Sequence, residues 1–362
     1  MKGFALTAAA VAATATTSFA GGIDRSGQDI SILFEEGNHV KLGFLTANPN
    51  VPSSPAGFAT QSAAAFNSFS LSIKQQVSEK LSFAVIMDEP FGADIRYIDG
   101  PLGSLGLLYP EPLKTAVSAD PNGRAFVDSK AITGLMRYEF GNGFSVHGGL
   151  RAQRVSGEIL SGSGVLRANS SYDFGGLAGV AYEIPKIAMR VALTYNTAIK
   201  HDLTGTHNFA AATGSVRIPE SFNLDFQTGI AKDTLLFGSV RHVKWNGTKL
   251  TTTSAFGTVD WVEFVDDSTT YEIGVGRKLN ENWSIAATFG YEEGASTGTT
   301  FLAPTGTSKS IGLGASYSRD NYKISGGVKY VMFDDKTVTS APLSATFNGH
   351  AIAAGLSLDF TY

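Results

Sequence analysis

The chain has 362 residues, with 28 Lys and Arg against 32 Asp and Glu, a formal net charge of −4, and no cysteine. The mild acidity excludes the basic face that nucleic-acid-binding proteins use, and the lack of cysteine excludes disulfides and thiolate metal sites. Charged residues make up 17% of the chain, against about 25% in globular domains, while Gly and aromatic residues are abundant.

The N-terminus has the features of an export signal. Lys2 forms a charged start, residues 4–13 are apolar or small, and residues 18–20 offer a small-residue cleavage site. The apolar run is too short to cross a bilayer, which needs about 20 residues. We therefore predict that residues 1–20 are a cleaved signal peptide and that the protein is delivered to the bacterial outer membrane.

The next residues, 21–38, are polar and do not alternate, so we expect a short N-terminal hatch or plug there. Residues 39–362 settle into segments of period two, and none of them contains the ~18 consecutive apolar residues of a membrane-spanning helix. A closed barrel pairs every backbone N–H and C=O within the membrane without helices. The predicted fold class is therefore all-β, a transmembrane antiparallel β-barrel over residues 39–362.

The connections between the alternating segments are of two kinds. Short turns fall at residues 78–80, 141–143, 185–186, 231–233, 280–282 and 319–321. Longer connections, rich in Gly, Ser, Thr and Pro, fall at residues 48–63, 95–125, 158–170, 203–214, 249–268, 296–307 and 336–346. Short and long alternate along the chain, as in barrels with tight periplasmic turns and long outer loops. This count predicts fourteen strands with both chain ends on the periplasmic side.

Alternation also predicts which side chains face the lumen. Facing a charge to lipid costs about 2–4 kcal/mol for Arg or Lys at the membrane midplane, so charged residues in the strands should point inward. The predicted lumen set is Lys74, Arg137, Glu139, Arg151, Arg190, Asp225, Arg241, Glu272 and Lys329. Two interpretations remain open: these groups pair with one another structurally, or Arg151, Arg190 or Arg241 binds the carboxylate of a ligand.

Two further groups of residues are noteworthy. Aromatic residues next to the short turns predict a girdle at the membrane interface: Tyr138, Phe140, Phe144, Tyr182, Trp283, Tyr322 and Tyr362. The second long connection is apolar around Leu102, Leu105, Leu107 and Leu108. Exposed apolar patches usually mark interaction, so this loop is either a landing site for a hydrophobic molecule or a cover over the barrel mouth.

Nothing in the sequence indicates an enzyme, a metal site or a cofactor. The six His residues are scattered without metal-ligand spacing. Ser145 and His147 share a face of one segment, but no acidic residue that could orient the His is identifiable.

Several segments resemble the FadL/TodX family of outer-membrane transporters of long-chain fatty acids and hydrocarbons. They are MDEPFGAD at 87–94, LTYN at 193–196, IKHDLTG at 199–205, IPESFNL at 218–224, LLFGSVR at 235–241, KW at 244–245 and WS at 283–284. The C-terminal sequence LSLDFTY, ending in Phe360 and Tyr362, is similar to the signal by which the barrel-assembly machinery recognises outer-membrane proteins.

The resemblance implies a fourteen-stranded barrel, an N-terminal hatch, hydrophobic substrate pockets and a kink in the third strand through which apolar cargo leaves sideways. In this sequence that lateral gate would comprise Asp88, Pro90 and Gly92. From the residues alone, a Pro in a strand indicates only an edge or a bulge, so Pro90 could instead end the strand at the outer rim. The hatch here is shorter than the family's and lacks its Asn-Pro-Ala element, which predicts a partial plug.

The sequence thus predicts an outer-membrane channel for passive uptake of long-chain fatty acids or other hydrophobic molecules. The alternative is a general diffusion porin for small polar solutes, although such porins usually have 16–18 strands. We expect a monomer whose partners are hydrophobic small molecules, outer-membrane lipid and the barrel-assembly machinery, without nucleic acid and without a cofactor.

Overall fold

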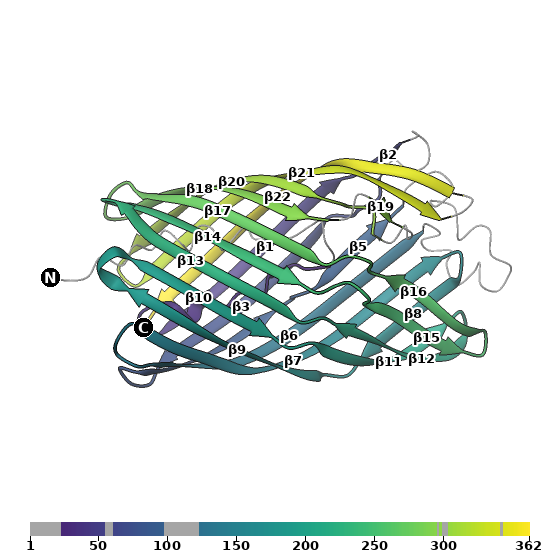
Figure 1. Cartoon of the computed structure of the whole chain (residues 1–362), viewed down its shortest axis with the longest axis horizontal. Coiled ribbons are helices and arrows are strands. Elements are labelled where there is room, and N and C mark those ends of the chain that lie inside the picture. The colour runs from purple at the N-terminus through teal and green to yellow at the C-terminus, as the bar shows by residue number, and fades with distance from the viewer. Residues whose placement is uncertain (1–22, 55–60, 98–122, 295–296, 299–302, 341–342) are drawn as a thin grey trace.

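The computed structural model describes residues 23–54, 61–97, 123–294, 297–298, 303–340 and 343–362. It is a closed antiparallel barrel of fourteen strands, as the sequence predicts (Figure 1). The barrel closes where β1 (His39–Asn50) pairs with β22 (Leu343–Thr361), for example Leu42 opposite Leu358. The predicted signal peptide, residues 1–20, lies outside the described residues. Within the described residues, no helix is long and apolar enough to span a membrane.

Eight barrel strands are single elements, and six consist of two pieces in line. The other single elements are β3 (Phe66–Gln76), β6 (Arg124–Glu139), β7 (Phe144–Ser161), β18 (Trp283–Glu293), β20 (Ser308–Arg319) and β21 (Tyr322–Ser340). The two-piece strands are β4 (Leu81–Asp88) with β5 (Gly92–Arg96), β9 (Asp173–Ile184) with β8 (Gly164–Ser170), and β10 (Met189–Asn196) with β11 (Ile199–His207). The remaining ones are β13 (Ser221–Ala231) with β12 (Ala210–Ile218), β14 (Thr234–Val243) with β15 (Lys249–Ser254), and β17 (Ser268–Lys278) with β16 (Gly257–Glu263).

Four short elements complete the described chain. β2 (Ser53–Ser54) pairs with β22, and β19 (Thr297–Gly298) pairs with β21. The 3-10 turn η3 (Pro185–Ile187) forms one of the tight connections, and η1 (Ser31–Phe34) lies inside the barrel. The C-terminus lies at the end of the barrel that carries the tight turns (Figure 1).

Four of the predicted long loops are instead strand in the structure. Residues 158–170, 203–214, 249–268 and 336–346 lie largely in the outer parts of the β7–β8, β11–β12, β15–β16 and β21–β22 hairpins, which lie at the end of the barrel opposite the tight turns (Figure 1). The prediction was wrong because Ser-, Thr- and Gly-rich sequence was interpreted as loop, whereas Thr favours strands and a polar outer face suits a hairpin in water.

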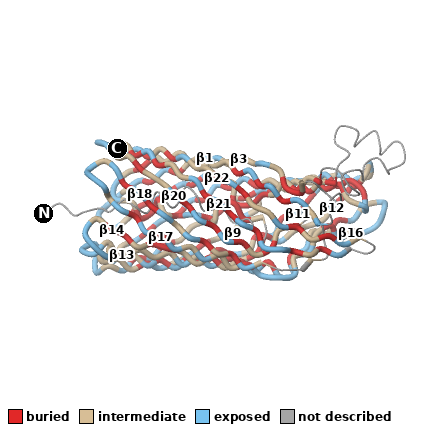
Figure 2. Tube along the Cα trace, turned by 90° about the horizontal axis from the view of Figure 1, so that it is seen from above, coloured by how far each residue is buried: buried red, intermediate tan, exposed pale blue. Residues whose placement is uncertain are grey.

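The two faces of the strands follow the predicted alternation. On β20, Ile311 and Leu313 are 55% and 67% exposed on the outside, whereas Ser308 and Ser310 are buried in the lumen. Figure 2 shows buried and exposed stretches following one another along the strands throughout the barrel. Most of the aromatic residues near the tight turns are also exposed, including Phe144, Trp283, Phe360 and Tyr362, as expected at a membrane interface.

Candidate transport path and lateral opening

The third barrel strand is interrupted in the middle of the barrel wall. β4 ends at Asp88 opposite Ala131 of β6, and β5 begins at Gly92 opposite Asp128. Three residues, 89–91, therefore face two residues of β6, which is a β-bulge with one extra residue. The strand stays attached to β6 here, because Ser129 Oγ accepts from the Phe91 N–H at 2.8 Å and donates to the Phe91 carbonyl at 2.6 Å. Pro90 thus lies in a bulge and does not end the strand.

At the bulge, the other edge of the same strand has no partner strand within the described residues. Pairing between β3 and β4 stops at Leu71 opposite Met87. Residues 67–70 of β3 still pair with β1, but within the described chain they have no strand partner on the side of β5. The next contact is farther out, where the Ala64 N–H donates to the Asp94 carbonyl at 2.8 Å. We call this interruption between β3 and β5 the unpaired stretch.

The N-terminal segment, residues 23–38, occupies the free edge of the bulge. The Gly92 N–H donates to the Ile23 carbonyl at 2.6 Å, and the Arg25 N–H donates to the Pro90 carbonyl at 2.8 Å. These two bonds flank an antiparallel bridge between Asp24 and Phe91. The segment therefore makes, over a few residues, the backbone pairing that β3 does not make.

The Arg25 side chain fills the unpaired stretch. Its guanidinium lies 4.2 Å above the centre of the Phe66 ring of β3, and the residue is 5% exposed. A Cβ atom at Gly92 would lie only 2.4–2.6 Å from this guanidinium, so Gly92 leaves room for Arg25. Burial lowers the pKa of Arg25, while nearby Asp128, Glu89 and Asp94 act in the opposite direction.

The other side of the segment is anchored to the far wall by Arg241 of β14. Its Nε donates to Asp24 Oδ2 at 2.5 Å, and its Nη1 donates to Asn223 Oδ1 at 2.6 Å. Nη2 reaches Gln28 Oε1 at 3.2 Å, and Asn223 Nδ2 donates to the Gly27 carbonyl at 2.8 Å. The segment is thus a strut across the lumen, from the bulge in strand three to β13 and β14.

The other predicted arginines also have internal partners. Arg190 and Arg137 lie 4.7 and 4.8 Å from the ring centre of Phe34 in η1, one cation–π contact each. Arg151 is buried and donates to Thr133 Oγ1 at 2.9 Å and to Asn196 Oδ1 at 3.2 Å. Arg151, Arg190 and Arg241 therefore all point into the lumen as predicted, and binding of a ligand carboxylate by any of them stays a prediction.

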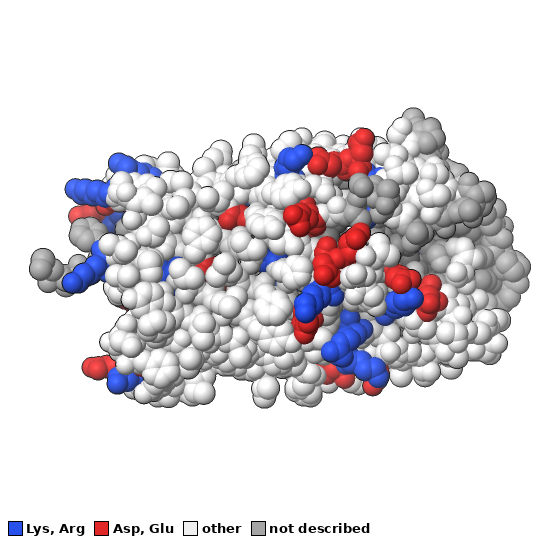
Figure 3. Space-filling view, in the orientation of Figure 1, with Lys and Arg blue, Asp and Glu red and all other residues white. Residues whose placement is uncertain are grey.

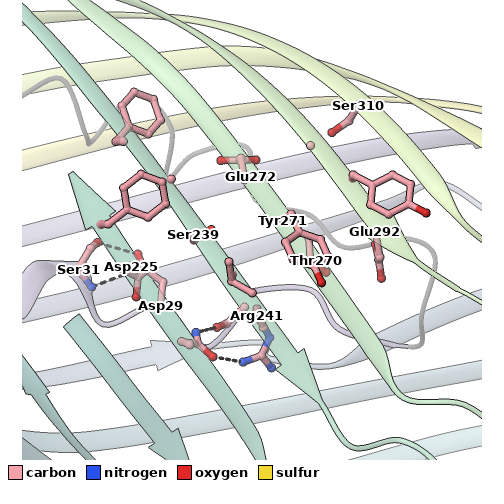
Figure 4. Close-up of a pocket in the computed structure, with 18 of the residues that line it drawn as sticks. Asp29, Ser31, Asp225, Ser239, Arg241, Thr270, Tyr271, Glu272, Glu292 and Ser310 are labelled. Atoms are coloured by element: carbon pink, nitrogen blue, oxygen red, sulfur yellow. Dashed lines mark hydrogen bonds between the residues drawn. The ribbon is translucent and has the colours of Figure 1, made fainter. Parts of the chain in front are cut away.

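The segment separates two cavities of about 170 and 110 Å³, both lined by Ser26, Asp29 and Ser31. The larger cavity lies against β13, β14, β17 and β20 among other strands, and charged side chains of both signs line it (Figure 4). The charged residues that line it are Asp29, Arg190, Asp225, Arg241, Glu272, Glu292 and Lys329. The smaller cavity lies against β1, β3, β4 and β22, beside the unpaired stretch, and is lined by Ser68, Ser70 and Ser72 among others.

Farther out, the lumen is apolar. A first cluster joins Phe91 to Trp245, with ring centres 5.7 Å apart, and includes Val155, Leu203, Ile218 and Val243. A second cluster fills the outer mouth with side chains that include Tyr97, Trp261, Phe333 and Phe347. The apolar lining reaches inward to Phe91, which lies in the bulge of strand three. Inward of the unpaired stretch, Leu33 and Phe34 of the N-terminal segment form a third apolar cluster with wall residues that include Ile86, so the segment occupies the lumen there.

Sequence reasoning identified Pro90 and Gly92 but missed Asp24, Arg25 and Phe91. The predicted apolar loop with Leu102, Leu105, Leu107 and Leu108 lies outside the described residues. His147 and Ser145 do not form a nucleophilic pair, since Ser145 accepts from Arg137 and His147 Nε2 contacts Thr194. Among the described residues, no group of three or more His, Asp or Glu is arranged to hold a metal ion.

The family model for outer membrane protein transport proteins (OMPP1/FadL/TodX) matches residues 53–362. The chain belongs to this family. Its barrel is similar to a Pseudomonas aeruginosa FadL homologue (13% identity, 91% of each chain covered, TM-score 0.70). It is also similar to the Pseudomonas putida toluene transporter TodX (13%, 95% of this chain and 99% of that one, TM-score 0.67) and to the CymD monoaromatic hydrocarbon channel (15%, 93% and 90%, TM-score 0.60). None of the curated proteins matches the chain.

At these identities the structural likeness shows the fold, and the family membership gives the class of function. The protein is an outer-membrane β-barrel of a family that transports hydrophobic compounds, and this family is not a class of enzymes.

Proposed function

We propose that the protein takes up long-chain fatty acids or similar hydrophobic molecules passively and releases them sideways through the unpaired stretch between β3 and β5. One observation carries this proposal: the outer apolar cluster of the lumen reaches inward to Phe91, at the level where the barrel wall lacks strand pairing. An apolar molecule gains about 25 cal/mol for each Å² that it buries away from water. Inward of this level it meets the N-terminal segment and the charged side chains that line the larger cavity.

The surroundings of the unpaired stretch suit such an exit. Phe69 of β3 and Met87 of β4 flank it and are 54% and 44% exposed on the outer surface. These side chains face the hydrocarbon region of the bilayer, so a molecule that leaves here enters lipid and not water. The outward end of the path is therefore apolar, like its beginning.

The smaller cavity supports an amphipathic cargo. Ser68, Ser70 and Ser72 of β3 line it together with charged residues of both signs, which are Arg25, Lys41, Asp29 and Asp88. A fatty acid could keep its carboxylate among these groups while its tail passes into the bilayer. Toluene and other monoaromatic hydrocarbons, the cargo named for related channels, would make no use of them.

Uptake into liposomes that contain the purified barrel tests the function directly. We expect labelled oleate to enter faster than through protein-free membranes and labelled glucose not to enter. Toluene measured in parallel distinguishes fatty acids from aromatic hydrocarbons. Glucose flux without any effect on oleate would contradict the proposal and favour the general porin.

Deletion of Pro90 tests the exit. It removes the extra residue of the bulge and lets strand three pair without interruption with both β6 and β3. If about two new backbone hydrogen bonds of ~1 kcal/mol each must break for passage, oleate uptake should fall roughly thirtyfold. Pro90→Thr is the matched control, because it keeps the extra residue and should retain most of the uptake. Equal uptake by the deletion variant and the wild type would argue against lateral exit here.

The three Trp residues allow the path to be followed by fluorescence. Trp245 is fully buried in the apolar lumen, whereas Trp283 is 47% exposed on the outside. In a variant with Trp261→Phe and Trp283→Phe, we expect brominated stearate to quench Trp245 in a saturable way. A variant that keeps Trp283 alone should respond to brominated phospholipid instead. Quenching of Trp245 by aqueous iodide but not by brominated stearate would indicate a water-filled path.

A further inference from the structure

The outer face of the barrel carries two pairs of like charges directly opposite each other. Lys130 of β6 is paired in register with Arg154 of β7, and Lys200 of β11 with Arg217 of β12. All four side chains are exposed and point away from the lumen. We call these four residues the cationic face. Between its two pairs runs the strand formed by β8 and β9.

Such pairs are unfavourable unless an anion lies near them. Like charges directly opposite on neighbouring strands destabilise a sheet, whereas opposite charges stabilise it. Elsewhere on the outer face the chain uses opposite charges, as where Lys309 Nζ lies 3.0 Å from Asp334 Oδ2. The nearby acidic groups compensate the cationic face only in part. Lys200 contacts Asp202 at 2.8 Å, and Glu220 is shared by Lys244 and Tyr195 at 2.6 Å each.

The cationic face lies at the outer edge of the lipid-facing surface. Farther inward on the same two strands are Ile132 and Leu150, which are 40% and 69% exposed. Inward of Lys200 and Arg217 are Leu193 and Phe222, which are 46% and 37% exposed. On the face drawn in Figure 3, a largely uncharged zone likewise ends at a band of charged side chains toward the outer end. Such a boundary between an apolar zone and a charged band fits the headgroup level of the outer leaflet.

Neighbouring residues add to the same surface. Arg154 lies 5.5 Å from the ring centre of Tyr172, which is 43% exposed, and Tyr is a preferred residue at headgroup level. Lys249 precedes Leu250, which pairs with Val216 in antiparallel register, so Lys249 lies beside Arg217 on the next strand. Lys249 is itself 3.0 Å from Glu263 and so contributes less free charge.

We propose that the cationic face binds the phosphate groups of a phosphorylated glycolipid of the outer leaflet, one phosphate at each pair. Arg and Lys form charge-assisted hydrogen bonds with phosphate, and a dianion between two cations removes their repulsion. The site is on the outside of the barrel, so it is independent of the transport path. It fixes the depth of the barrel in the membrane and orients β6, β7, β11 and β12 toward one class of lipid.

Native mass spectrometry of the full-length barrel in neutral detergent tests this proposal. The probe is a bis-phosphorylated glucosamine-disaccharide lipid, compared with its dephosphorylated form. We expect the wild type to retain the phosphorylated lipid only. Lys130→Gln with Arg154→Gln, or Lys200→Gln with Arg217→Gln, should each weaken binding roughly thirtyfold, since each basic residue near an anionic headgroup contributes about 1 kcal/mol.

Lys309→Gln is the matched control, because Lys309 lies at the same outer edge but is paired with Asp334. It should bind as the wild type does, and the heat-dependent gel shift of folded barrels verifies that each variant is folded. Equal binding of the two lipid forms would overturn the proposal. So would undiminished binding by a variant with all four substitutions, or complete displacement of the lipid by inorganic phosphate alone, which would indicate a small-anion site.

Discussion

Oleate uptake should stop when the N-terminal segment is covalently fixed to the bulge and should resume when the link is reduced. Asp24 and Phe91 are antiparallel bridge partners, a geometry that a disulfide fits. The chain has no cysteine, so Asp24→Cys with Phe91→Cys gives a single defined pair. In the oxidised form the segment cannot leave strand three and Arg25 cannot leave the unpaired stretch, so we expect uptake at the background level of protein-free liposomes.

The comparison is between oxidised and reduced forms of the same protein, because the substitutions also remove the contact of Asp24 with Arg241. Ser284→Cys with Ser316→Cys is the control, since these buried serines are partners in the wall between β18 and β20, away from the segment. Its oxidation should leave uptake unchanged. If the oxidised form with the 24–91 link transports as fast as the reduced form, the segment does not have to move for transport.

Replacement of Arg241 by Ala should both destabilise the barrel and let small solutes leak. Asp24 and Arg241 are 3% and 7% exposed, so the variant leaves a buried carboxylate without its partner. Breaking a buried ion pair in this way typically costs about 3–5 kcal/mol. The segment also loses its anchors to β13 and β14, so the two cavities should join into an open path. We expect a lower urea midpoint for unfolding in vesicles and a higher single-channel conductance in planar bilayers.

Arg277→Ala is the matched control, because Arg277 Nη1 donates to Thr234 of the neighbouring strand and not to the segment. Its conductance should equal that of the wild type. Asp24→Asn combined with Arg241→Gln removes both charges together and should recover part of the lost stability. An Arg241→Ala barrel with wild-type conductance would show that Arg241 does not hold the segment in place.

The barrel could be predicted from sequence because its determinants are local. Alternation along each strand and short turns next to it fix the strand count and the two faces, as for Ile311 and Leu313 on the outside of β20. The outer hairpins were missed because their polar, Thr-rich strands look like loops when they are not facing lipid. Their inner faces pack in the outer apolar cluster, as Leu166 and Trp261 do, and that contact is not visible in the sequence.

The candidate site could be predicted only in part. Pro90 and Gly92 could be identified because they are unsuited to a regular strand. The alternation along the strands also predicted that Arg151, Arg190 and Arg241 face the lumen, as they do. Their partners could not be found, because they lie far away along the chain: Asp24 and Arg241 are 217 positions apart, and Ser26 and Asp88 are 62 apart. Gly92 was expected to permit a bend, whereas in the structure it makes room for Arg25.

The bulge at residues 89–91 is also a place where strand three can contain a different number of residues than its neighbour β6. Before the bulge the even-numbered Ala84, Ile86 and Asp88 face inward, and beyond it the odd-numbered Phe91, Ile95 and Tyr97 do so. Strand three therefore keeps both of its faces on either side of the bulge while its residue count changes. Engineered insertions at position 90 should widen the exit without turning Ile95 or Tyr97 toward lipid, so the size of released molecules could be set by the number of residues inserted there.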